Sequence, residues 1–204
     1  MLPSSLGFLS LAVSKGPARL KHHPLRGENL NHAPQQGSVR VRVQLRRGGR
    51  LVRVLVLYYS RGGRTEALAK AVAEGVGGVE GVSAVVKRVD YATVEDFISC
   101  DAVAFGSPNY FSYMAGLMKD FFDRALSIRE RVAGKPAAAF TSGGGSSDSA
   151  LRSLERMIDS FRLQKASEGI VSSSEPSKSD LDKCRSLGAT LAKAALKRAE
   201  EPRE

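Results

Sequence analysis

The alternation of apolar and polar segments from residue 51 onward predicts a repeated order of strand and helix. An apolar run at 51–57 is followed by a short Ser/Gly/Thr loop and then by an Ala-rich helical pattern from Thr65 to about Val76. Short apolar strands at 101–106 and 136–141 each run into a polar loop before the next helical pattern. This order predicts an α/β fold with a parallel, doubly wound sheet and helices on both of its faces.

Further segments complete the pattern and indicate which helix faces are buried. We expect two more strands, at 83–89 and 166–171, and a short helical turn at 94–98. Two more helices are expected at 149–161 and 178–199. In the last helix, residues at spacings of three and four predict one packed face: Leu181, Cys184, Gly188, Leu191 and Ala195. In the helix that begins at about Gly116, we expect Leu117, Phe121 and Leu126 to face the core.

The first 50 residues differ from the rest of the chain in charge. They hold nine of the 31 Lys and Arg residues and one of the 21 acids, so the net charge of +10 belongs mainly to them. Residues 1–37 lack sustained periodicity, and the alternating segment 39–45 fits an extra edge strand. We interpret residues 1–50 as a basic, largely disordered arm and residues 51–204 as one domain. A solubilising tail is favoured over nucleic-acid binding, because no recognition motif accompanies the charges.

Residue types that are scarce in the chain exclude several kinds of chemistry. All three histidines lie in the arm, and two cysteines stand far apart at Cys100 and Cys184. The domain therefore has no His-based acid/base pair, no usual zinc site and no metal site of another kind that we can identify. No apolar run approaches the roughly 20 residues that span a bilayer, so we expect no transmembrane segment. Two cysteines cannot form a disulfide framework, which favours a cytoplasmic location.

Three polar loops follow three of the predicted strands, at 60–65, 107–113 and 142–147. In a doubly wound parallel sheet, ligands bind beyond the carboxyl ends of the strands, where these loops would meet. The first loop combines glycines with the start of a helix, which offers backbone N–H groups and a positive helix end to an anion. A tight strand–helix turn without a ligand is the simpler alternative for this loop taken alone. The coincidence of three such loops favours a phosphorylated ligand.

The residues of these loops resemble those of a known family. Segment 60–65, with hydroxyl residues at its ends and glycines inside, resembles the flavodoxin phosphate loop, and segment 105–111 resembles the Gly-Ser/Thr-Pro segment of flavodoxin-like flavoproteins. The continuation is similar to the WrbA-type NAD(P)H:quinone oxidoreductases and to NADPH-dependent FMN reductase-like flavoproteins at Met114, Gly116, Met118, Phe121 and Asp123. The resemblance covers about residues 51–200 and implies the flavodoxin strand order 2-1-3-4-5 in a five-stranded sheet.

The resemblance also implies FMN as the cofactor and assigns residues to it. The 5′-phosphate would be held by Ser60, Arg61, Gly62, Gly63, Arg64 and Thr65. The isoalloxazine would be flanked by Pro108, Asn109, Tyr110 and Phe111 on one side and by Ser142, Gly143 and Gly144 on the other. Tyr110 is the best candidate for stacking on a flat apolar ring. No side chain is assigned a catalytic role, because the flavin would carry the chemistry.

Three functions remain open at this point. The first is an FMN-dependent oxidoreductase that takes electrons from NADPH or NADH and passes them to a quinone or a similar small acceptor. The second is a flavodoxin-like one-electron carrier that docks on redox partner proteins, although such carriers are typically acidic and residues 51–204 are nearly neutral. The third is a non-catalytic binding module that uses the arm. The sequence does not decide whether the chain forms a homo-oligomer.

Overall fold

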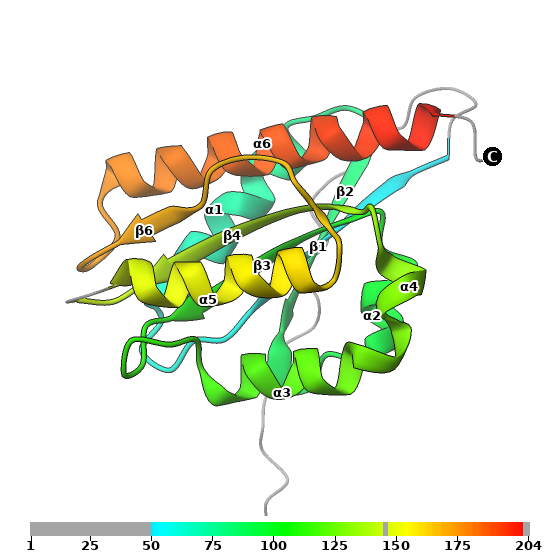
Figure 1. Cartoon of the computed structure of the whole chain (residues 1–204). Coiled ribbons are helices and arrows are strands. Elements are labelled where there is room, and N and C mark those ends of the chain that lie inside the picture. Colours follow the sequence, from blue (N-terminus) through cyan, green and yellow to red (C-terminus); the bar gives the residue numbers. More distant parts are fainter. Residues whose placement is uncertain (1–49, 145–146, 202–204) are drawn as a thin grey trace, which may run out of the picture. The chain divides into compact units, whose positions relative to one another are not determined.

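A parallel sheet with helices on both faces forms the part of the chain that the computed structural model describes, residues 50–144 and 147–201 (Figure 1). The strands are β1 (Val52–Tyr58), β2 (Val82–Arg88), β3 (Ala102–Pro108), β4 (Pro136–Ser142), β5 (Gln164–Lys165) and β6 (Ile170–Ser172). Their order is β2-β1-β3-β4-β5, with β6 also paired to β4, and every pairing is parallel. The doubly wound flavodoxin-like order is therefore confirmed. The arm and the predicted edge strand at 39–45 lie outside the described residues.

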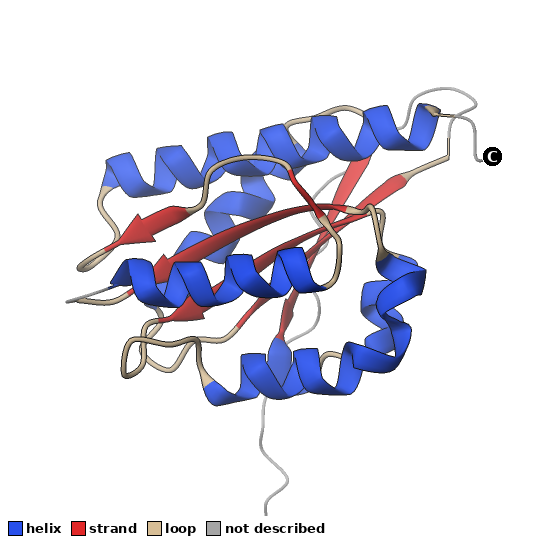
Figure 2. Ribbon diagram, in the orientation of Figure 1, coloured by secondary structure: helices blue, strands red, loops and turns tan. Residues whose placement is uncertain are grey.

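The sheet lies between two layers of helices (Figure 2). They are α1 (Arg64–Gly77), α2 (Val94–Ser99), α3 (Gly116–Ala125), α4 (Arg129–Val132), α5 (Ser147–Ser160) and α6 (Lys178–Glu200), with short 3-10 turns at η1 (Val89–Tyr91) and η2 (Leu126–Ile128). Helices α1 and α6 cover one face of the sheet, and α2, α3 and α5 cover the other. Five phenylalanines that contact one another dominate this second layer: Phe97, Phe105, Phe121, Phe122 and Phe161. Within the described ranges, no helix is long and apolar enough to cross a membrane.

Helices α1 and α6 approach each other so closely that their contact requires glycine. A Cβ at Gly188 would lie 2.0 Å from the Val72 carbonyl oxygen, and one at Gly75 would lie 1.9 Å from the Arg185 carbonyl oxygen. The packed face predicted for α6 is confirmed, since Cys184, Leu191 and Ala195 are among its buried residues. Gly75 lies inside α1 at the crossing point, and Gly78 is the C-cap of this helix.

Helix α3 turns a different face to the core than we predicted. Phe121 is fully buried, but Leu117 and Leu126 are largely exposed. The buried residues are Met118, Phe121, Phe122 and Ala125, which follow the helical spacing of three, four and seven. Leu117 and Leu126 lie nine residues apart in the sequence, and the prediction of both as core was wrong because they do not share that stripe.

The fifth strand position is filled in two pieces. Strand β5 pairs with residues 136–137 of β4, β6 pairs with residues 140–142, and the chain leaves the sheet at 166–169. Gly169 lies against α5, where a Cβ would be 2.4 Å from Leu151 Cδ1. The continuous strand predicted at 166–171 therefore begins late, because Glu168 points to solvent and Gly169 packs against a helix.

Candidate functional site

The three predicted loops meet at the carboxyl edge of the sheet. Thr65, in the first turn of α1, shares a hydrogen bond of 2.8 Å between its Oγ1 and Ser142 Oγ at the end of β4. The backbone N–H of Asn109, after β3, donates to the Ser142 carbonyl at 2.7 Å, and the Asn109 side-chain amide donates to the Gly144 carbonyl at 3.3 Å. Residues that are up to 77 positions apart in sequence thus form one site.

Loop 60–65 is shaped so that its backbone N–H groups remain free. Ser60 Oγ accepts a hydrogen bond of 3.0 Å from the Gly63 N–H, and Gly63 has a φ of 86°, a left-handed conformation that glycine adopts without strain. The Ala67 N–H reaches the Gly63 carbonyl at 2.9 Å. Among the described residues, no protein atom accepts from the N–H groups of 61, 62 and 64–66. Such a loop fits an anion, since unpaired N–H groups at a helix start bind phosphate.

The space in front of this loop is open. A Cβ added at Gly62 would meet no atom within 4 Å, and the flanking side chains of Arg61 and Arg64 are exposed. The Arg64 guanidinium pairs with the carboxylate of Glu175, from the loop between β6 and α6. Arg64 is therefore held beside the loop by an ion pair, whereas Arg61 faces solvent.

Loop 107–113 is a rigid hairpin. Ser107 Oγ accepts from the Ala115 N–H at 2.8 Å, and the backbones of Tyr110 and Tyr113 exchange hydrogen bonds of 2.9 and 3.0 Å. The two residues at its tip, Phe111 and Ser112, have φ values of 51° and 61°, which are uncommon for residues other than glycine. These left-handed residues form a two-residue turn that leaves the Phe111 side chain fully exposed.

The hairpin carries the aromatic wall of the site. The Tyr110 ring meets the Tyr59 ring edge to face, with their centroids 6.3 Å apart. Tyr58, by contrast, is packed in the core, and burial raises the pKa of its hydroxyl. Tyr58 therefore serves strand packing, while Tyr59 stands at the border of the site. The sequence alone gave Tyr59 no signal of this, because the contact depends on the fold of the hairpin.

The third loop brings in a fourth segment that we did not predict. The Gly143 N–H donates to the carbonyl of Ser172, the last residue of β6, at 2.9 Å. Ser172 is itself buried, and its hydroxyl donates to Asp180 at the start of α6. The loop between β6 and α6 therefore forms another wall of the site. The strand predicted at 166–171 ended one residue before Ser172, so this contact was not expected from the sequence.

One buried polar atom in the site lacks a partner. Asn109 Oδ1 is enclosed, and no described residue donates a hydrogen bond to it. An unpaired buried acceptor is costly in a native protein, and such atoms concentrate where a ligand or a conformational change supplies the donor. Together with the free N–H groups of loop 60–65, this acceptor indicates that the carboxyl edge is built to hold a polar ligand.

The thirteen predicted site residues divide into three groups by burial. Ser60, Thr65, Pro108 and Ser142 are buried and are used within the protein, Asn109 and Gly143 are half-buried, and the exposed ones are Arg61, Gly62, Gly63, Arg64, Tyr110, Phe111 and Gly144. The structure brings all three segments together at one edge. Residues 145 and 146 of the predicted third loop lie outside the described residues.

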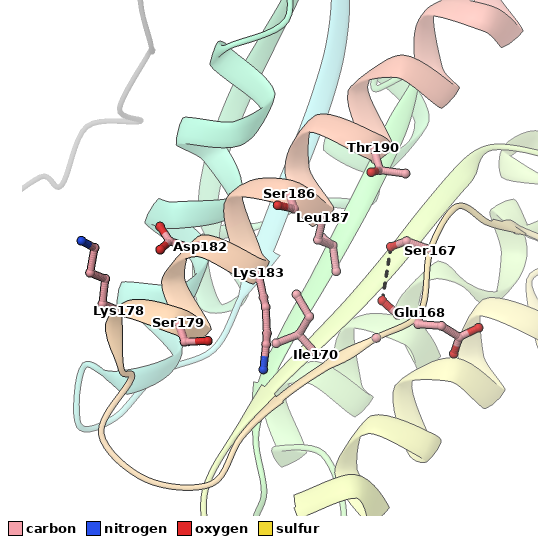
Figure 3. Close-up of a pocket in the computed structure, with 11 residues that line it drawn as sticks. Ser167, Glu168, Ile170, Lys178, Ser179, Asp182, Lys183, Ser186, Leu187 and Thr190 are labelled. Carbon is pink, nitrogen blue, oxygen red and sulfur yellow. Dashed lines mark hydrogen bonds between the residues drawn. The ribbon is translucent and has the colours of Figure 1, made fainter.

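Two larger hollows lie away from these loops. One of about 730 Å³ separates α6 from segment 167–170, where Lys183 extends toward Ile170 (Figure 3). Another of about 790 Å³ lies at the amino ends of the strands, between Lys135 and Arg198. Neither contains a residue of the three loops.

The cysteines have no place in the site. Burial raises the pKa of Cys100 to about 11 and that of Cys184 to about 12, so both are protonated thiols at neutral pH. Both residues are structural. Among the described residues, no group of three His, Cys, Asp or Glu side chains is placed to bind a metal ion.

Comparisons with known proteins agree with this geometry. The family model described as NADPH-dependent FMN reductase matches residues 80–175. A flavodoxin from Aquifex aeolicus (strain VF5) is 35% identical over 157 residues, which are 69% of this chain and 85% of that protein.

Solved structures share the fold at lower identity. A WrbA-like flavodoxin from Agrobacterium tumefaciens superimposes with a TM-score of 0.63 and 23% identity, over 72% of this chain and 98% of that one. The flavodiiron core from Synechocystis sp. PCC6803 superimposes with a TM-score of 0.63 and 20% identity, over 73% of this chain. The match spans only 37% of that longer chain. From the loop geometry and the flavodoxin relative together, the chain belongs to the flavodoxin-like FMN-binding superfamily.

Proposed function

We propose that FMN binds at the carboxyl edge of the sheet with its phosphate in loop 60–65. The free N–H groups of this loop and its open front at Gly62 support the assignment. Ser60 would shape the loop through its bond to Gly63, while Thr65 would tie it to Ser142. Arg61 and Arg64 would add positive charge next to the dianion.

The flavin ring would lie between the second and third loops. Tyr110 offers an aromatic surface, and Pro108, Asn109 and Phe111 would complete this side. The backbone around Ser142, Gly143 and Gly144 would close the other side. The unpaired Asn109 Oδ1 would be an acceptor for a polar edge of the ring once the loop adjusts to the ligand.

We infer that the protein is an FMN-dependent oxidoreductase acting between NAD(P)H and a quinone-like acceptor. FMN, once bound, would supply the hydride- and electron-transfer chemistry. The protein would position the ring, exclude water from its covered face and leave one face accessible. The description of the matching family model and the nearly neutral charge of residues 51–204 support an enzyme.

An electron carrier is the second candidate. The relative from Aquifex aeolicus is named a flavodoxin, and it shares 35% identity with this chain. In that role the exposed Tyr110 and Phe111 would face a partner protein instead of a small substrate. The two candidates share the FMN site and differ in what reduces it.

Reduction of the purified full-length protein, loaded with FMN, separates the candidates. For an oxidoreductase we expect NADPH or NADH to bleach the flavin absorbance rapidly and a quinone to restore it. Bleaching by dithionite or by a redox protein alone would establish the carrier instead. A protein that takes up no FMN would contradict both.

The role of the arm has its own test. We propose that residues 51–204 form the working domain and that the basic arm is dispensable for flavin binding. Removal of residues 1–49 spares Arg50, which pairs with Asp101. Unchanged FMN affinity and turnover are expected; a loss of either would assign the arm a part in function.

A further inference from the structure

Arg88, the last residue of β2, reaches across to the first residue of the phosphate loop. Its Nη1 donates to the Ser60 carbonyl oxygen at 2.7 Å, although the two residues are 28 positions apart. Its Nη2 and Nε donate to the Asp90 carboxylate at 2.8 and 3.3 Å. The guanidinium also lies over the Tyr59 ring, 5.6 Å from the centroid. Three groups thus fix one side chain that the sequence did not single out.

The bond to Ser60 determines which way the next peptide group points. A trans peptide is planar, so its C=O and N–H point in opposite directions. With the Ser60 carbonyl directed at Arg88, the Arg61 N–H faces away from Arg88 and finds no acceptor among the described residues. A rotated peptide would turn a carbonyl oxygen toward the anion and remove a donor from it.

We propose that Arg88 is a positioning residue that holds the Ser60–Arg61 peptide in the orientation that accepts a phosphate. The inference rests on the proposed FMN site and deepens it. Arg88 is not assigned as a phosphate ligand, because its fork is already occupied by Ser60 and Asp90. It acts on the ligand through the loop backbone.

The shape of the guanidinium explains why arginine suits this position. One edge binds a carboxylate in a bidentate manner while another N–H remains for the carbonyl. Asp90 is only two residues away and orients the fork, and Tyr59 supports its flat face. A lysine would offer an Nζ to Ser60 but could not keep all these contacts in one plane.

A comparison of FMN with riboflavin tests the proposal, because riboflavin has the same ring and lacks the phosphate. The full chain and its Arg88→Met variant are titrated with both ligands, with quenching of flavin fluorescence as the readout. For Arg88→Met we expect about tenfold weaker FMN binding, a free-energy change of about 1.4 kcal/mol, and riboflavin binding within about threefold of the wild type. Arg88→Lys should recover part of the FMN preference.

Lys87→Met is the matched control. Lys87 precedes Arg88 in the same strand, is buried to a similar extent and forms an ion pair with Asp96 in place of Asp90. The Lys87→Met substitution removes the same charge without changing a contact of the loop. The affinities for FMN and for riboflavin should therefore remain at the wild-type level.

The outcomes distinguish this proposal from the FMN site itself. Wild-type protein that binds neither ligand would contradict the site. If the wild type binds both ligands and Arg88→Met binds both with the same affinities, the role of Arg88 is overturned. Equal losses for both ligands would show that Arg88 supports the ring site or the fold and would also overturn it. If Arg88→Met does not fold, the ratio of riboflavin to FMN affinity in Arg88→Lys decides.

Discussion

The two edges of the sheet use their polar groups in different ways. At the amino edge, Lys135 is buried and its Nζ donates to the carbonyls of Phe97, Ile98 and Cys100 at 2.8, 2.7 and 2.6 Å. All three of its donors are therefore used within the protein. At the carboxyl edge, by contrast, the N–H groups of residues 61, 62, 64 and 65 and Asn109 Oδ1 have no partner among the described residues.

The buried acid of the amino edge, Asp101, is also paired within the protein. Asp101 accepts from the Arg50 guanidinium and, at 2.9 Å, from the Arg53 N–H. This edge also has a hollow of about 790 Å³, yet its most buried charges are already paired. If FMN binds as proposed, unpaired polar groups mark the ligand site better than the size of a hollow does.

Gly62→Val should have the largest effect on the carboxyl edge. Its side chain would enter the open space in front of the loop without meeting protein atoms, so the fold should persist while the phosphate is excluded. We expect FMN affinity to fall about 100-fold or more, which corresponds to about 2.7 kcal/mol. Fluorescence titration measures it, and circular dichroism checks the fold. Tight FMN binding by this variant would refute the phosphate loop.

Lys135→Met tests the opposite edge. It leaves three carbonyls without their donor, so we expect a loss of about 2–3 kcal/mol in the free energy of unfolding. FMN affinity of the folded protein should not change. Urea unfolding measures the loss, with the exposed Lys193→Met as the control. An affinity loss that matched the stability loss would remove the distinction between the edges.

Tyr110→Ala should weaken binding of the flavin ring equally in ligands with and without the phosphate. Loss of a stacking aromatic is expected to reduce FMN and riboflavin affinity about tenfold alike. The control is Tyr91→Ala, which removes another exposed tyrosine that lies outside the three loops. A loss confined to FMN would place the ring elsewhere.

Asp180→Asn should affect stability only, although Asp180 lies beside the site. Hydrogen bonds from the backbone and hydroxyl of Ser177 hold the pKa of Asp180 below its usual value. Because the pKa of Asp180 is lower in the folded state than in the unfolded state, the carboxylate stabilises the fold fully at pH values above its unfolded-state pKa. This stabilisation is lost as the pH falls through the folded-state pKa. At neutral pH the variant should be about 1 kcal/mol less stable. The difference from wild type should shrink below about pH 3.

Urea unfolding at the two pH values checks the Asp180 prediction, and Asp182→Asn in the same helix turn serves as the control. A stability difference that persisted in acid would mean that the carboxylate charge is not its source. Weaker FMN binding by Asp180→Asn would show that satisfied groups at this edge also serve the ligand.

Local patterns in the sequence predicted most of the strands and helices and the three loops, whereas the strand order came from the resemblance to flavodoxin-like proteins. Period-two and period-3.6 patterns mark the elements, and Ser, Gly and Pro mark the strand ends. The helix faces were partly missed, as Leu117 and Leu126 show, since a single apolar residue can lie on either side of a stripe.

The hydrogen bonds that join the segments of the site could not be predicted from local patterns. The contact of Arg88 with Ser60 joins residues 28 positions apart, and that of Asn109 with Gly144 joins residues 35 apart. Such contacts depend on how parallel strands place their ends side by side. Ser172 was missed because the predicted strand ended at residue 171, and its contact with Gly143 depends on the pairing of β6 with β4.

The most direct test of the account is a calorimetric titration of the full chain with FMN, riboflavin and inorganic phosphate. We predict a single FMN site, weaker binding of riboflavin and competition of phosphate with FMN, with the FMN preference abolished in Gly62→Val. Absence of FMN binding, or equal affinity for FMN and riboflavin in the wild-type protein, would contradict a phosphate site at the carboxyl edge.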